Sequence, residues 1–239
     1  ISVPLIPSAT ELMDDVCIRA VNKAVNAGLP DAQAICMIEV DGGPETVARE
    51  LKVAEDVAVR SGAFHVQVSD DGRQMAKWTS ARKSVMSALS RLGDDLVSVS
   101  LADDMAVPVS KVPEAVVAFH RIAEENRVIV GTYGHAADGN LHTKMLLDPC
   151  SEDSWKRGER AVGQIYDTVI ALGGTVTGEH GVGISKAPYM MRERPDAWRT
   201  MLAIKKALDP QNILNPGKLM QWEGGTLMDL RYPCPGPIR

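Results

Sequence analysis

Two histidines, His135 and His142, stand seven residues apart in the segment that begins at Gly134. Apolar runs that predict strands flank this segment, and Asp138-Gly139 between the histidines favours a tight reversal of the chain. Such a reversal could bring the two imidazoles together, and two neutral imidazoles are half of a zinc-type site. The spacing is also compatible with two surface histidines near a turn.

A second segment, from Gly173 to Gly183, holds five glycines in eleven residues. Glycine loses more backbone freedom on folding than any other residue, so this density indicates a close approach to the main chain or positive φ angles. Glu179 could complete a metal site of two histidines and one carboxylate. In extended backbone its neighbour His180 would face a different space, where it could move a proton. The alternative is a flexible loop with a solvated Glu-His pair.

A third segment, from Asp209 to Lys218, ends a predicted helix and then turns. The pattern predicts a sharp turn that buries Ile213 and Leu214. By itself this segment indicates no function.

Hydrophobic periodicity predicts the elements that position these segments. One helix is capped by Thr10 and ended by Gly28. Further helices are predicted at 47–60, 77–92, 113–126, 152–172 and 198–208, and strands at 34–40, 64–68, 96–101, 128–133 and 141–147. The order of these elements predicts an α+β fold: a mostly antiparallel sheet with helices packed on one face, in a duplicated ferredoxin-like arrangement.

Composition limits the class of protein. With 239 residues, of which 45% are hydrophobic, the chain can bury a large core, and we expect one domain at 1–220 followed by a Gly- and Pro-rich tail at 221–239. The net charge of -5 comes from interspersed acids and bases, so nucleic acid is not an expected partner. The four cysteines form no C-x-x-C pair and predict no thiolate zinc site.

The sequence contains no apolar run of the roughly 18 to 20 residues that a membrane-spanning helix requires, so no transmembrane segment is expected. We expect a cytoplasmic protein, or one that is peripheral at the membrane through a partner, or one in an organellar matrix if the source is eukaryotic. The sequence opens on Ile1, which indicates that sequence upstream is missing.

Taken together, the segments resemble the C-terminal domain of the FAD-linked oxidases, a family that includes the glycolate oxidase catalytic subunit, D-lactate dehydrogenases and D-2-hydroxyglutarate dehydrogenase. The resemblance covers essentially the whole chain. It rests on 39–42, 78–82, 104–108, the two-histidine loop, the Thr-Gly-Glu-His-Gly-Val-Gly loop, and 213–218.

The resemblance implies roles for single residues. The implied metal ligands are His135, His142 and Glu179, and the implied general base is His180. The residues implied to bind the substrate are Arg82 and Asn140, and those implied to lie near the flavin are Asn215 and Lys218. The implied cofactors are FAD and a divalent metal, with Zn²⁺ as the expected ion.

The function that follows from the resemblance is the substrate-side half of an FAD-dependent D-2-hydroxy acid dehydrogenase or oxidase. Its electron acceptor is unknown. The family's N-terminal FAD-binding domain has no counterpart in this sequence, so a missing domain or a separate subunit is the expected partner. Ala102 stands where some relatives with larger substrates carry a lysine, which favours a monocarboxylate such as D-lactate or glycolate.

Two other functions remain open at this stage. The same two-histidine, one-glutamate set could serve a metal-dependent hydrolase that needs no flavin. The chain could also be a non-catalytic docking subunit of a flavoenzyme complex.

Overall fold

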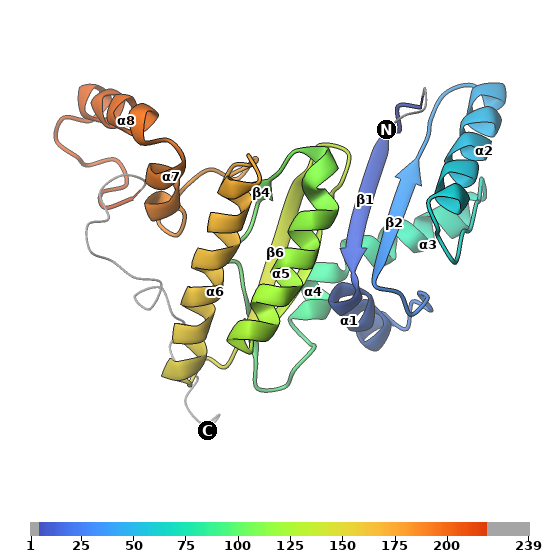
Figure 1. Ribbon diagram of the computed structural model, residues 1–239, viewed down its shortest axis with the longest axis horizontal. Coiled ribbons are helices and arrows are strands. Elements are labelled where there is room, and N and C mark those ends of the chain that lie inside the picture. The colour runs from blue at the N-terminus through green and yellow to red at the C-terminus, as the bar shows by residue number, and fades with distance from the viewer. Residues whose placement is uncertain (1–4, 219–239) are drawn as a thin grey trace. The chain divides into compact units, whose positions relative to one another are not determined.

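The computed structural model describes residues 5–218, so the predicted tail at 221–239 lies outside the described residues. The chain divides into two compact units. Unit 1 comprises residues 1–92 and 131–137, and unit 2 comprises residues 93–130 and 138–239. Each unit has its own antiparallel strands and its own helices (Figure 1).

Unit 1 is built on three antiparallel strands in the order β2, β1, β5. Its elements are β1 (Ala9–Asp14), α1 (Asp15–Val25), β2 (Ala34–Glu39), α2 (Pro44–Arg60), α3 (Gly72–Lys83), α4 (Val85–Leu89) and most of β5 (Ile129–His135). Leu12 of β1 is paired with Cys36 of β2 on one side and with Gly134 of β5 on the other. Helix α1 contacts β1, β2 and α4.

Asp14 joins the first strand to the first helix. Its buried carboxylate accepts hydrogen bonds from the backbone N–H of Cys17 at 2.8 Å and from that of Thr132 in β5 at 2.6 Å. The first bond caps α1, as an Asp at this position commonly does. The predicted helix start at Thr10 is therefore wrong, because residues 9–14 pair with two strands and the helix begins only at Asp15.

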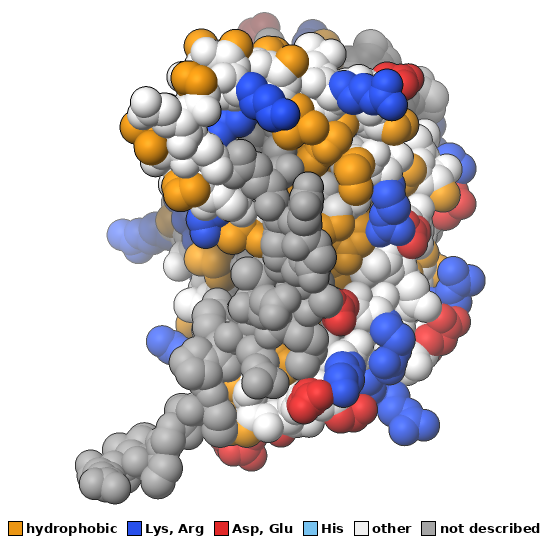
Figure 2. Space-filling model, turned by 90° about the vertical axis from the view of Figure 1, so that its left-hand side faces the viewer, with side chains coloured by type: hydrophobic (Ala, Val, Ile, Leu, Met, Phe, Trp, Pro, Cys, Tyr) orange, Lys and Arg blue, Asp and Glu red, His pale blue; other side chains and the backbone are white. Residues whose placement is uncertain are grey.

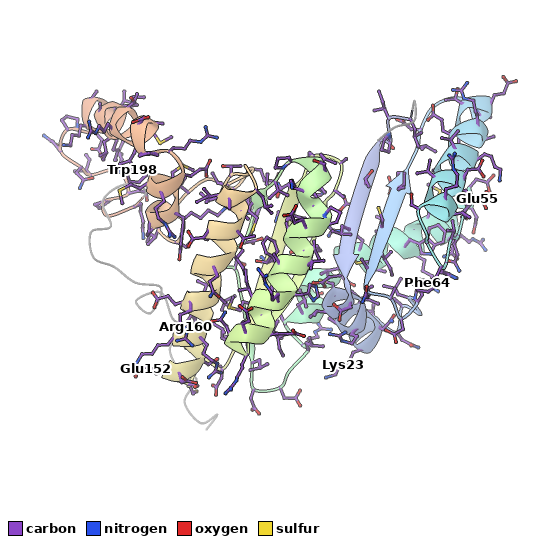
Figure 3. The ribbon with its side chains drawn as sticks, in the orientation of Figure 1. Lys23, Glu55, Phe64, Glu152, Arg160 and Trp198 are labelled. Carbon is purple, nitrogen blue, oxygen red and sulfur yellow. The ribbon has the colours of Figure 1, made fainter. Side chains whose placement is uncertain are left out.

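The predicted strand at 64–68 is also wrong. None of these residues is in a strand, and the side chains of Phe64 and Val68 are 76% and 47% exposed. Figure 3 labels Phe64 in this segment between α2 and α3. Three alternating apolar residues are compatible with a strand, but a strand forms only where a partner supplies the backbone hydrogen bonds.

Unit 2 is built on β6, which pairs antiparallel with both β3 and β4. Its elements are β3 (Val97–Val99), β4 (Met105–Ala106), the 3₁₀ turn η1 (Val109–Lys111), α5 (Val112–Asn126), β6 (Asn140–Leu147), α6 (Glu152–Ala171), α7 (Ala187–Glu193) and α8 (Pro195–Leu208). Ala106 is paired with Asn140 of β6, and on its other side it forms a bridge with Thr175. The short strand β4 thus lies between β6 and the glycine-rich segment.

Helix α6 covers one face of β6. Ser151 caps it by accepting a hydrogen bond from the N–H of Ser154 at 3.1 Å, and Glu152, labelled in Figure 3, lies in its first turn. A Cβ atom on Gly158 would approach the side chains of Leu147 and Met145. Because side chains alternate along a strand, α6 packs on the odd-numbered face of β6 and leaves the even-numbered face to other contacts. Helix α5 packs on α6 (Figure 1).

The α+β class with antiparallel strands and packed helices is confirmed. Hydrophobic periodicity did not predict the strands β1 and β4 or the helix α7. The prediction that Ile213 and Leu214 are buried was wrong, because their side chains are 70% and 60% exposed.

Figure 2, which views the molecule from the α8 end, shows apolar side chains at the surface among lysines and arginines. In the described part of the chain, no helix is long and apolar enough to cross a membrane.

Candidate metal and substrate site

The even-numbered face of β6 carries three buried polar side chains: Asn140, His142 and Lys144. A lysine in the middle of a buried strand needs a charged partner, because an isolated buried ammonium loses its hydration without compensation. Asp103 is that partner, with its Oδ2 at 2.5 Å from Nζ of Lys144. Nζ also donates to Oγ of Ser100 at 2.6 Å.

Asp103 also determines how His142 presents its ring. Oδ1 of Asp103 lies 3.1 Å from Nδ1 of His142. Burial alone would raise the pKa of Asp103, but hydrogen bonds from His142 and Lys144 and the charge of Lys144 hold that pKa below its ordinary value. An ionised carboxylate only accepts hydrogen bonds, so Nδ1 of His142 is the donor in this contact and Nε2 is directed away from Asp103.

Nε2 of His142 faces the glycine-rich segment. Nε2 of His142 lies 3.7 Å from Oε1 of Glu179, and Nε2 of His180 lies 3.4 Å from the same oxygen. The rings of His142 and His180 are stacked with centroids 5.4 Å apart. The expectation that Glu179 and His180 face different spaces is therefore wrong. The backbone bends at 178–180 and is not extended there.

This bend is held by Asp104, whose φ of 58° lies in the left-handed region. Its Oδ1 accepts from the backbone N–H of Glu179 at 2.8 Å and its Oδ2 from that of His180 at 2.9 Å. Nζ of Lys186 lies 2.8 Å from Oδ2. Burial would raise the pKa of Asp104, but the hydrogen bonds from Lys186, His180 and Glu179 hold it far below its ordinary value.

Two of the glycines are explained by close contacts within the protein. A Cβ atom on Gly174 would lie 2.3 Å from the carbonyl oxygen of Ala106. A Cβ atom on Gly178 would lie 2.8 Å from Nδ2 of Asn140 and 3.0 Å from Oδ1 of Asp104. The close approach predicted for this segment thus comes from β4 and from the site's own side chains.

Asn140 has a buried acceptor that is left over. Its Nδ2 lies 3.4 Å from Oδ1 of Asp104, but its Oδ1 is buried without a hydrogen-bond partner in residues 5–218. A buried amide oxygen without a partner is costly, and a ligand hydroxyl would satisfy it. This observation fits the substrate-side role predicted for Asn140.

His135 belongs to unit 1 and has an arrangement of its own. It lies opposite Glu11 in the pairing of β5 with β1, so the two side chains share a face of the sheet. Nδ1 of His135 lies 2.7 Å from Oε1 of Glu11, and Nη2 of Arg82 lies 2.7 Å from Oε2 of Glu11. His135 and His142 thus each have a carboxylate at Nδ1, as histidines that bind a metal commonly do.

Arg82, predicted to bind a substrate carboxylate, pairs here with Glu11. Its guanidinium also lies over the ring of Tyr133, 4.8 Å from the centroid. Its Nε is buried and has no hydrogen-bond partner among the described residues. One N–H donor of Arg82 is therefore not satisfied by the described residues.

The two predicted flavin contacts lie on the turn after α8. Asn215 and Lys218 are exposed, and the backbone N–H of Lys218 donates to the carbonyl of Asn215 at 3.2 Å. Asn215 has a φ of 50°. Exposed side chains on a turn can contact a cofactor but do not enclose it, so they fit one edge of a flavin site.

Sequence reasoning missed the residues that support the predicted ligands. These are Glu11, Asp103, Asp104, Lys144 and Lys186. One signal for them was present, because a charged residue within an apolar run indicates a buried ion pair. Lys144 stands in such a run, but its partner could not be read from the sequence.

The donor atoms of unit 2 fit a divalent metal. Asp103, His142 and His180 offer ligand atoms within 4.8 Å of one another, and so do Asp104, Glu179 and His180, although both carboxylate oxygens of Asp104 are already bound to backbone N–H groups. Imidazole nitrogen and carboxylate oxygen are ligands that Zn²⁺ accepts. The pairing of Nδ1 of His142 with Asp103 is the orientation that a histidine ligand needs.

Comparison with known proteins identifies the chain's relatives. Residues 2–219 match the sequence model of the family described as FAD linked oxidases, C-terminal domain. The glycolate oxidase subunit GlcD of Bacillus subtilis is 38% identical over 221 residues, which are 92% of this chain and 46% of that protein. The mitochondrial D-lactate dehydrogenase [cytochrome] of Arabidopsis thaliana is 30% identical over 89% of this chain and 37% of that protein. The chain thus spans less than half the length of these relatives.

Two solved structures share the fold at low sequence identity. The 4-ethylphenol oxidase of Gulosibacter chungangensis superimposes with a TM-score of 0.63 at 13% identity, over 90% of this chain and 48% of that one. A p-cresol methylhydroxylase has a TM-score of 0.63 at 14% identity, over 87% of this chain and 46% of that one.

Proposed function

This chain belongs to the family of FAD-linked oxidase C-terminal domains, and from that premise we propose that it forms the substrate-side half of an FAD-dependent D-2-hydroxy acid dehydrogenase or oxidase. Glycolate oxidase and D-lactate dehydrogenase are the activities named for its relatives. We propose a small monocarboxylate such as D-lactate or glycolate as the substrate.

The observation that carries this proposal is the convergence in unit 2. Nε2 of His142 and Nε2 of His180 both lie within 4 Å of Oε1 of Glu179. Beside them, the buried Oδ1 of Asn140 lacks a partner in the described part of the chain. The oxidation of a metal-bound hydroxy acid requires a nitrogen ligand and a carboxylate ligand for the metal, a base for the hydroxyl proton, and a hydrogen-bond acceptor for the substrate. This part of unit 2 offers a candidate for each of these groups.

His142 and Glu179 would hold the metal, with His135 as the third ligand that the family resemblance predicts. A bound divalent cation would polarise the substrate's hydroxyl oxygen and lower the pKa of that hydroxyl. The contact of Nδ1 of His142 with Asp103 would orient the ring for binding through Nε2.

His180 is the proposed general base. Its side chain is about half exposed, so Nε2 can reach a bound hydroxyl and take its proton. Asn140 would accept a hydrogen bond through Oδ1, and the guanidinium of Arg82 would bind the substrate carboxylate, as the family resemblance predicts. These contacts would orient the hydrogen on the α-carbon.

The flavin would accept that hydrogen as hydride, which completes the oxidation to a 2-oxo acid. Asn215 and Lys218 would contact the flavin from the turn after α8. The rest of the flavin site would come from an N-terminal FAD-binding domain or from a separate subunit.

Metal binding is tested on the chain itself. The protein is purified without a metal-affinity tag and its zinc, manganese, iron and cobalt contents are measured by elemental mass spectrometry. We expect close to one divalent ion per chain, lost in His142→Ala/Glu179→Ala and kept in His65→Ala, which removes an exposed histidine outside the site. A folded chain that contains no metal and binds none added would overturn the metal-dependent part of the proposal.

Catalysis is tested in a chimera, in which this chain replaces the matching part of the Bacillus subtilis GlcD relative. We expect D-lactate or glycolate to reduce the bound flavin, and we expect His180→Ala to slow that step by about 10² to 10⁴-fold. The chain alone should not oxidise either acid. Hydrolysis of an ester by the metal-loaded chain alone would favour the hydrolase alternative.

A further inference from the structure

We propose that Asp104 and Lys186 are a positioning pair that fixes the backbone of Glu179 and His180 before any ion or substrate binds. This inference rests on the proposed function, because it assigns the pair a purpose at that site. The pair lies wholly within unit 2.

The carboxylate of Asp104 is fully buried, and its oxygens accept hydrogen bonds from residues of the glycine-rich segment. Besides the two backbone N–H groups described above, Oδ2 accepts from Oγ1 of Thr177 at 3.1 Å. The main-chain carbonyl of Asp104 accepts from the N–H of Gly178 at 2.9 Å. One residue thus binds four consecutive positions, 177–180.

Lys186 supplies the charge that makes this burial possible. Its side chain is 7% exposed, and Nζ donates to Oδ2 and to the carbonyl oxygen of Asp104, with Oγ1 of Thr177 at 3.4 Å. An ammonium has three donors, so all three are directed into this cluster. Without Lys186 the carboxylate would be buried and uncompensated.

Glu179 and His180 need such an anchor because their own side chains do not supply one. These side chains are 55% and 54% exposed, so packing restrains them little. Two consecutive amides bound to one carboxylate restrict the backbone between them, and this sets where both side chains project. The pair therefore acts through the backbone and does not touch the reacting atoms.

The chain offers a matched control in Asp209. Its carboxylate also pairs with a lysine, with Oδ2 2.5 Å from Nζ of Lys205. It also accepts two backbone N–H groups, from Ile213 and Leu214, each at 3.0 Å. Asp209→Asn thus removes the same kind of cluster at the end of α8.

The test is amide hydrogen exchange on the full 239-residue chain without metal, followed by titration with Zn²⁺. In Asp104→Asn the remaining amide oxygen can still accept from Glu179, so we expect exchange at the amide of His180 to speed up roughly ten- to hundredfold, as for loss of a charge-assisted hydrogen bond. We expect Zn²⁺ affinity to fall by about 10- to 100-fold. Asp209→Asn should lower the melting temperature, but it should leave the exchange rates at residues 179 and 180 and the Zn²⁺ affinity at native values.

A double variant keeps the test decisive if the single one does not fold. Asp104→Asn/Lys186→Met leaves no buried charge, so it should fold while its amide nitrogen cannot accept from His180. Unchanged exchange at residues 179 and 180 in either folded variant overturns the proposal. If the native chain binds no Zn²⁺, the metal site fails as a function, and the exchange result still decides whether the pair holds the loop.

Discussion

At the residue scale, the ring of His142 depends on Asp103. Asp103→Asn replaces an anionic acceptor with an amide that can also donate, so the proton of His142 is no longer held on Nδ1. We expect Zn²⁺ affinity to drop about 10- to 100-fold and the ring-nitrogen NMR shifts to report a mixture of tautomers. Asp138→Asn, which changes an exposed carboxylate four residues before His142, should alter neither reading.

Glu11 has the corresponding position in unit 1, between Arg82 and His135. Glu11→Gln removes the negative charge that contacts both Arg82 and His135, and it leaves the mostly buried Arg82 without its ion pair. We expect a loss of about 2 kcal/mol in the free energy of unfolding, measured by urea denaturation. A loss within experimental error would show that water already screens the pair.

At the element scale, Gly174 permits the contact between the glycine-rich segment and β4. Gly174→Ala would place a Cβ atom 2.3 Å from the carbonyl oxygen of Ala106, so the backbone must shift. We expect a cost of about 1–3 kcal/mol in urea denaturation. A Cβ atom on Gly163, in the middle of α6, would have only Oη of Tyr189 within 4 Å among the described residues outside its own helix backbone, so Gly163→Ala should be neutral or stabilising by up to about 1 kcal/mol. Equal effects of the two substitutions would contradict the packing argument.

The turn after α8 should depend on pH. The hydrogen bond from Lys205, together with those from the N–H groups of Ile213 and Leu214, holds the pKa of Asp209 below its ordinary value of 3.8. A lowered folded-state pKa gives stability that is present above the unfolded-state value and is lost as pH falls towards the folded-state value. The difference in melting temperature between the native chain and Asp209→Asn should therefore be largest near pH 6 and shrink towards pH 3. A difference that stays constant with pH would contradict this.

At the scale of the whole molecule, the choice of substrate is the property to test. Ala102 is buried, and its carbonyl accepts a hydrogen bond from the hydroxyl of Thr143. Because an alanine side chain carries no charge, it cannot pair with a second carboxylate of a substrate. In the GlcD chimera we expect kcat/KM for D-lactate or glycolate to exceed that for D-2-hydroxyglutarate by at least about tenfold. A preference for the dicarboxylate would show that another cation of the site binds it.

Local pattern was enough to predict much of this protein. The long helices α5 and α6 follow from their amphipathic spacing and from local caps such as Ser151, because these depend on residues within a few positions. The candidate site residues stand out in the sequence because histidines and glycines occur together in segments 134–142 and 173–183. Family resemblance then implied their roles, which the experiments above test.

Only the tertiary structure decided which side chains support the site. Asp104 and Lys186 are 82 residues apart, and Asp103 and Lys144 are 41 apart. Such pairs form because strand register brings β4 beside β6 and beside residue 175, and register is set by contacts that no short window of sequence contains. For the same reason Arg82 could not be matched to Glu11 from the sequence, nor could residues 64–68 be seen to lack a partner strand. The sequence by itself determined the long helices α5 and α6 and the reactive residue types, and the long-range pairing determined how those residues are held.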